Sequence, residues 1–164
     1  NYMNRKHISI FLYSLLFSAL VLVLNTYSAS AQQLNPAKCT LKLEQVAEEQ
    51  YKLLFDFQIQ DGWYVYSQSV PENGPMPTTF VFDKGQPITD NILAEIGEAK
   101  EGYDANFDMV VKKYAHHVTF ETQPITAKAG TLISGTYTYM TCNDKSCLPP
   151  KDISFSVILT ATEQ

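Results

Sequence analysis

Cys142 and Cys147 are the residues of this sequence with the clearest capacity for covalent chemistry. Four residues separate them, in a segment that reads Tyr-Met-Thr-Cys-Asn-Asp-Lys-Ser-Cys-Leu-Pro-Pro and ends at Pro150. Strand-like runs flank this segment, so we expect the pair at the tip of a hairpin, close enough to form a disulfide. Because so short a ring constrains the unfolded chain little, the bridge should add only about 2 kcal/mol of stability. A weakly stabilising bridge in an exposed loop is suited to thiol–disulfide exchange.

The reactivity of such a pair depends on the fraction of thiolate, and therefore on the thiol pKa. Lys145 lies inside the ring and would stabilise a thiolate, whereas the neighbouring Asp144 would oppose it. These two charges leave the sign of the net effect open. From the spacing alone, a redox-active dithiol and a structural hairpin disulfide are equally good interpretations.

The N-terminal segment has the pattern of an export signal. A basic n-region at residues 5–7 precedes an apolar stretch at residues 8–24 and an Ala-Ser-Ala sequence at residues 29–31. We therefore expect a signal peptide over residues 1–31, a mature chain that begins at Gln32, and a periplasmic location. An uncleaved signal anchor is the alternative, because the apolar stretch is at the lower length limit for a spanning helix.

Composition narrows the classes of partner. The chain has 12 Lys and Arg against 17 Asp and Glu, a formal net charge of −5, and no basic patch, which argues against nucleic acid. The adjacent pair Lys112–Lys113 is interpreted as part of a solvated strand face. In an oxidising compartment the three cysteines leave one unpaired. Cys39 is predicted to be a buried free thiol that packs as a small hydrophobe, with a resolving or intermolecular role as the alternative.

The mature chain, residues 32–164, is predicted to be one all-β domain. Residues 52–60 alternate, with apolar side chains at every second position facing one side. Turn signals separate about seven short strands, which indicates a two-sheet sandwich. The expected strands are 39–44, 52–60, 63–66, 78–83, 110–121 with a break near His116, 132–141 and 153–159, and residues 92–102 are ambiguous.

Other kinds of site receive little support. His116 and His117 are adjacent, so on a strand their side chains would point to opposite faces. No Cys-x-x-Cys or His-x-x-x-His spacing supplies further metal ligands. No glycine-rich phosphate loop or nucleophile-elbow serine is present. We expect no cofactor and no metal, although a copper or zinc site built from the cysteine pair and a histidine is an alternative.

Two motifs point to a known family. Residues 62–68 read Gly-Trp-Tyr-Val-Tyr-Ser-Gln and are followed by a proline-rich segment, and the Cys-x4-Cys-Leu-Pro-Pro motif comes later in the chain. Together they resemble the N-terminal periplasmic domain of the thiol–disulfide interchange protein DsbD and its single-domain relatives, over nearly the whole mature chain. The resemblance implies an immunoglobulin-like two-sheet antiparallel β-sandwich in which Cys142 and Cys147 are the exchanging, catalytic pair.

The resemblance also implies partners. In the family, the pair accepts electrons from a membrane-embedded thiol reductase through its thioredoxin-like domain. It then passes them to oxidised periplasmic proteins, such as a disulfide isomerase or cytochrome c maturation factors. No transmembrane reductase or thioredoxin-like domain follows in this sequence, so these partners are expected in trans, with loss of the relay in this chain as the alternative.

Four further residues are assigned to the surroundings of the pair by the same resemblance. Tyr64 and Tyr66 match aromatic residues that flank the cysteines in the family. A family cap loop that shields the disulfide is matched by residues 103–108, with Phe107 as the covering ring and Asp104 as the acid. The acidic pair that precedes the aromatic in the family is not reproduced here.

Three functional hypotheses follow. The first is an electron-relay thiol–disulfide oxidoreductase of the periplasm. The second is a non-catalytic immunoglobulin-like protein-binding module in which the disulfide is structural. The third is a periplasmic metal carrier.

Overall fold

The computed structural model describes residues 34–88 and 90–161, so the signal peptide expected over residues 1–31 lies outside the described residues. In the described part every regular element is a β-strand. No helix there is long and apolar enough to cross a membrane. The chain from Asn35 onward forms one compact unit.

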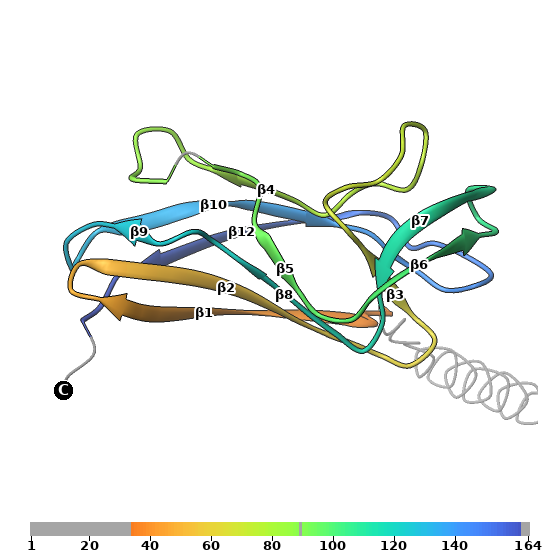
Figure 1. Cartoon of the computed structure of the whole chain (residues 1–164), viewed down its shortest axis with the longest axis horizontal. Helices are drawn as coiled ribbons and strands as arrows, with labels where there is room; N and C mark the ends of the chain where they lie inside the picture. The colour runs from red at the N-terminus through yellow and green to blue at the C-terminus, as the bar shows by residue number, and fades with distance from the viewer. Residues whose placement is uncertain (1–33, 89, 162–164) are drawn as a thin grey trace, which may run out of the picture. The chain divides into compact units, whose positions relative to one another are not determined.

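The strands form three antiparallel sheets (Figure 1). The first has the order β1-β2-β8-β5 with β9 also paired to β2, the second is β12-β10-β4, and the third is β11-β3-β7-β6. The strands are β1 (Ala37–Ala47), β2 (Gln50–Ile59), β3 (Tyr64–Tyr66), β4 (Thr79–Phe82), β5 (Ala94–Ile96), β6 (Ala99–Asp104), β7 (Met109–Tyr114), β8 (His117–Glu121), β9 (Ile125–Thr126), β10 (Leu132–Tyr139), β11 (Thr141–Cys142) and β12 (Lys151–Ile158).

The first two sheets pack face to face and enclose an aromatic core. Every second residue of β2 points inward, as the alternation predicted, and Leu53, Phe55 and Phe57 are fully buried. The Phe55 ring lies 4.7 Å from that of Phe80 on β4 and 5.5 Å from that of Tyr137 on β10, measured between centroids. The predicted all-β class is thus confirmed, and the chain forms an immunoglobulin-like antiparallel β-sandwich.

The third sheet lies at one end of the sandwich, where Figure 1 shows β3, β6 and β7 together. It arises where two predicted strands break. The strand expected over residues 110–121 divides into β7 and β8 around His116, whose φ of 63° turns the chain. The strand expected over residues 132–141 ends at Tyr139 and resumes as the short β11. The ambiguous stretch 92–102 becomes β5 and the start of β6.

Glu95 on β5 connects the first sheet to the third. Its carboxylate accepts hydrogen bonds from the Ser67 hydroxyl (2.9 Å) and the Gln68 backbone N–H (2.7 Å), just after β3. It also accepts one from the Tyr114 hydroxyl (2.5 Å) and pairs with Lys112 (3.0 Å), both on β7. The side chain of Glu95 is only 10% exposed. This carboxylate therefore holds the end of β3, which carries Tyr66, against β7.

Candidate redox site

The cysteine pair lies at the third sheet, and the two sulfurs are unequally accessible. Cys142 and Cys147 form a disulfide, as the sequence predicted. Cys142 lies in β11 opposite Tyr64 of β3 and is fully buried, whereas Cys147 is partly exposed. The expectation that the whole pair lies in an exposed loop is therefore wrong for Cys142. Because β11 is paired to β3, Cys142 faces the interior. Only Cys147, which lies after β11, reaches the surface.

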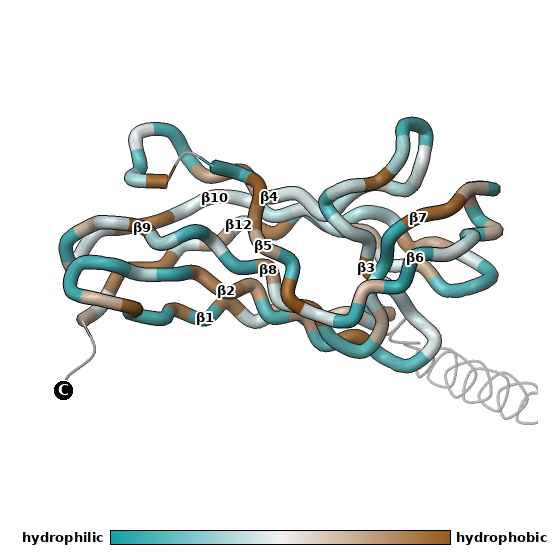
Figure 2. Tube along the Cα trace, viewed as in Figure 1, coloured by the Kyte–Doolittle hydropathy of each residue, from teal (hydrophilic) through white to brown (hydrophobic). Residues whose placement is uncertain are grey.

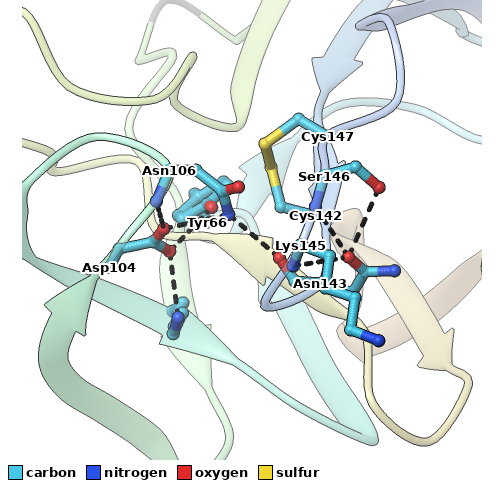
Figure 3. The surroundings of a disulfide bond; sticks show 9 residues. Tyr66, Asp104, Asn106, Cys142, Asn143, Lys145, Ser146 and Cys147 are labelled. Atoms are coloured by element: carbon cyan, nitrogen blue, oxygen red, sulfur yellow. Dashed lines mark hydrogen bonds and ion pairs between the residues drawn. A yellow bond between two sulfur atoms is a disulfide. The ribbon is translucent and has the colours of Figure 1, made fainter.

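Hydrogen bonds to the side chain of Asn143 shape the ring between the two cysteines (Figure 3). The Asn143 side-chain oxygen accepts from the backbone N–H groups of Lys145 (2.9 Å) and Ser146 (2.8 Å). The Asn143 N–H in turn donates to the Ser146 carbonyl at 2.9 Å. An asparagine that bonds the backbone two and three residues ahead stabilises a turn. The ring is thus a compact turn rather than an open loop.

Tyr64 and Tyr66 both lie at this end of the sandwich, on β3. Tyr66 is fully buried and donates its hydroxyl to Asp104 Oδ2 at 2.9 Å. Burial, together with the hydrogen bond and the charge of Asp104, raises the pKa of Tyr66 well above its usual value. Tyr64 is opposite Cys142 in the ladder, and the Lys113 ammonium lies 4.2 Å from the centroid of its ring. The two tyrosines therefore form one wall of the site through different contacts.

Asp104 and Lys113 form a nearly buried ion pair beside the tyrosines. Their N–O distance is 2.9 Å, and their side chains are 2% and 12% exposed, respectively. Burial on its own would raise the pKa of Asp104, but the hydrogen bonds from Lys113 and Tyr66 outweigh it and lower the pKa. Asp104 is thus an ionised acceptor. The interpretation of Lys112 and Lys113 as a solvated face was wrong for Lys113, whose side chain is nearly buried, whereas Lys112 stays partly exposed and pairs with Glu95.

Phe107 packs against the small apolar cluster that includes Cys142. It is partly buried against a small cluster formed by Tyr66, Val111 and Cys142, to which Cys147 also belongs. Its ring meets that of Tyr66 edge to face, with centroids 6.1 Å apart and planes at 87°. Figure 2 shows hydrophobic residues in β7 at this end, where Val111 contributes to the cluster. Residues 104–107 therefore bring an acid and an aromatic to the cysteine pair, and their roles in exchange remain a prediction.

The sequence was compared with known proteins. It matches the family described as "Thiol:disulfide interchange protein DsbD, N-terminal" over residues 31–158. The chain belongs to the DsbD N-terminal domain family. A comparison with curated proteins gave no match. Among solved structures, the reduced N-terminal domain of DsbD from Neisseria meningitidis is similar, with 22% identity, a TM-score of 0.42, and coverage of 75% of this chain and 86% of that one.

Membership of the DsbD N-terminal family and a formed Cys142–Cys147 bridge fit thiol–disulfide interchange. In chemical terms, the described part of this family member offers a disulfide with one accessible sulfur, a carboxylate and two tyrosines. No set of three or more potential metal-ligating side chains gathers within residues 34–88 and 90–161. His116 contacts Asp61, and His117 contacts Asp56, which also binds Lys42, so neither histidine bonds to the cysteines.

Cys39 of this DsbD-family domain is a free thiol on β1 that packs against the aromatic core and is half-buried, rather than fully buried as the sequence predicted. Burial raises its pKa to about 12, against a partly opposing hydrogen bond with Tyr137. Because the thiolate is the reactive form, we predict that Cys39 resists alkylation by iodoacetamide at pH 8 in the folded protein and reacts fully after unfolding in urea. Mass spectrometry counts the adducts. Rapid labelling of Cys39 in the folded protein would contradict this burial.

Proposed function

We propose that the Cys142–Cys147 pair relays reducing equivalents from a membrane-embedded thiol reductase to oxidised proteins of the periplasm. The observation that carries the proposal is the unequal exposure of the two sulfurs in a chain of the DsbD N-terminal family. An exchanging disulfide needs one sulfur that a partner can reach and one that stays with the protein. A disulfide whose only role is to cross-link the fold needs neither.

The first half of the relay reduces the disulfide. A thiolate of the donor attacks Sγ of Cys147, the intramolecular S–S bond breaks, and its electron pair leaves on Sγ of Cys142. The second thiol of the donor then attacks the mixed disulfide, so the donor leaves oxidised and both cysteines of this protein are reduced. Protons lost by the two donor thiols balance those gained by Cys142 and Cys147.

The second half returns the electrons to a substrate. The Cys147 thiolate attacks a substrate disulfide, and Cys142 resolves the resulting mixed disulfide and restores the bridge. We assign Tyr64, Tyr66, Asp104 and Phe107 to the surroundings that position and shield the sulfurs. The proposed partners are thioredoxin-like redox proteins and a membrane-embedded thiol reductase, and residues 1–31 direct export to the periplasm and are then removed.

A redox titration of the folded protein tests this function. The folded protein is equilibrated in glutathione or dithiothreitol buffers and quenched with acid, its free thiols are then alkylated after unfolding in urea, and adducts are counted by mass. With three cysteines, the oxidised form should carry one thiol and the reduced form three. We expect a midpoint between about −270 and −180 mV, the range of known exchange proteins.

The same titration distinguishes the alternative of a binding module. A bridge with a potential below about −300 mV, which opens only after unfolding, would make the disulfide structural and contradict the relay.

A further inference from the structure

β1 is an edge strand, and no other strand within residues 34–88 and 90–161 pairs with its outer side (Figure 1). The Pro36 carbonyl accepts from the Gln60 N–H at 2.8 Å, so the even-numbered residues of β1 bond to β2. The odd-numbered residues turn their N–H and C=O groups outward, and the first outward carbonyl, that of Ala37, accepts from the Tyr139 hydroxyl at 3.3 Å. Residues 38–44 therefore present a free edge that can pair with a further strand.

The apolar side chains behind this edge are incompletely covered. β12, the edge strand of the second sheet, lies on the same side of the sandwich, because Lys151 at its start donates to the Asn35 side chain just before β1 at 2.6 Å. The two strands together thus border an open apolar seam. The side chains of this seam pack against the aromatic core and are only partly buried: Cys39, Leu41, Leu43, Phe155 and Val157.

The charges along β1 are arranged to suit a second copy of the same strand. Lys38 and Glu44 are both exposed and lie at equal distances in sequence from Leu41. Two antiparallel copies related by a two-fold axis at Leu41 would place Lys38 of each chain opposite Glu44 of the other. The same register sets Cys39 opposite Leu43, apolar against apolar. Opposite charges directly across two strands stabilise the pairing, and the two-fold axis forms each contact twice.

Neighbouring registers are less favourable. An axis at Thr40 would set Lys38 opposite Lys42, and an axis at Lys42 would set the two copies of that lysine opposite each other, which is destabilising. An axis at Leu43 would extend the pairing into residues 45–47, where β1 is irregular. The sequence of β1 therefore favours the register centred on Leu41.

We propose that the protein forms a homodimer through antiparallel pairing of its β1 strands about a two-fold axis at Leu41. The first sheets of the two copies then become one continuous sheet, and the half-buried side chains of each seam gain a partner. The paired segment, residues 38–44, contains no residue of the third sheet, so the proposal goes beyond the relay and does not depend on it. Cys39 of one copy does not meet Cys39 of the other, and the dimer is non-covalent.

Sedimentation velocity over a series of protein concentrations measures the dissociation constant of the dimer. Lys38→Glu and Glu44→Lys each create two like-charge pairs in their own homodimer, whereas a mixed dimer of the two variants has both opposite-charge pairs again. Lys84→Glu is the control, because Lys84 is exposed, lies outside β1 and undergoes the same change of charge. Position 44 is also opposite Lys52 of the same chain, so thermal unfolding checks the fold of each variant. Non-reducing electrophoresis checks that no intermolecular disulfide contributes.

The wild type and Lys84→Glu should dimerise with the same dissociation constant. Each β1 variant alone should bind itself about tenfold more weakly or worse, and an equal mixture of the two should recover dimers to within about threefold of the wild type. A wild type that stays monomeric at every concentration would overturn the proposal. So would dimers of Lys38→Glu as tight as those of the wild type, a result that decides even where Glu44→Lys fails to fold.

A mixture of two folded variants that stays monomeric would contradict the register and with it the proposal. None of these outcomes changes the redox midpoint expected for Cys142 and Cys147, so failure of the dimer and failure of the relay are distinguishable.

Discussion

A Cys142→Ser variant is expected to lose disulfide turnover completely while Cys147 still forms mixed disulfides, and these should persist. The buried Cys142 is the resolving group in the proposed relay, so without it the partner stays attached. The matching Cys147→Ser variant retains only a fully buried thiol. Burial in apolar surroundings raises the pKa of a thiol and blocks access to it, so this variant should form adducts about tenfold more slowly or worse.

Both variants are best made in a Cys39→Ser background, which removes the one other thiol. Each is mixed with oxidised glutathione, and the adduct is followed by mass. The two variants have the same composition and differ only in which sulfur remains, so the comparison isolates accessibility. Faster or more stable adducts on Cys142 than on Cys147 would reverse the assignment of the attacked sulfur.

The sequence predicted the parts of the fold that depend on local patterning. Alternation along residues 52–60 was sufficient for β2, because the side chains of a strand alternate between its two faces. The disulfide followed from the short spacing of its cysteines. Tyr64, Tyr66, Asp104 and Phe107 were assigned to the surroundings of the pair through family motifs, and the structure brings them together with it. Their chemical roles remain predictions.

The parts that were missed all depend on pairings between distant segments. Burial of Cys142 follows from the pairing of β11 with β3. This pairing cannot be predicted from the sequence of either segment alone. Lys113 looked solvated because its counter-ion and its aromatic partner come from β6 and β3. Asn106 donates a hydrogen bond to the backbone carbonyl of Asn143, 37 residues away. The local sequence signal for the ion pair of Lys113 was the presence of two adjacent lysines in an otherwise apolar strand. Such a pair of lysines is as compatible with carboxylate partners from distant strands as with exposure to solvent.

Replacing Glu95 by glutamine should lower the free energy of unfolding by about 2 to 4 kcal/mol at pH 7. Donors from Ser67, Gln68 and Tyr114 converge on this carboxylate, and Lys112 neutralises it. A glutamine has one acceptor oxygen where the carboxylate has two, and its amide would face donors, which leaves buried groups unsatisfied. Urea unfolding followed by the fluorescence of the single tryptophan measures the change. Glu101→Gln, an exposed glutamate on β6, is the control and should change stability by less than about 0.5 kcal/mol.

The difference between wild type and Glu95→Gln should itself depend on pH, and in one direction. Burial alone would raise the pKa of Glu95, but hydrogen bonds from Tyr114, Gln68 and Lys112 outweigh it and lower the pKa from 4.5 to about 2. A carboxyl whose pKa is lower in the folded state stabilises the protein fully above its unfolded pKa, and this stabilisation is lost as pH falls toward the folded value. The wild type should therefore lose its advantage over the variant between about pH 4.5 and about pH 2. A constant difference across that range would mean that the packing of Glu95, and not its charge, joins β5 to the strands that carry the redox site.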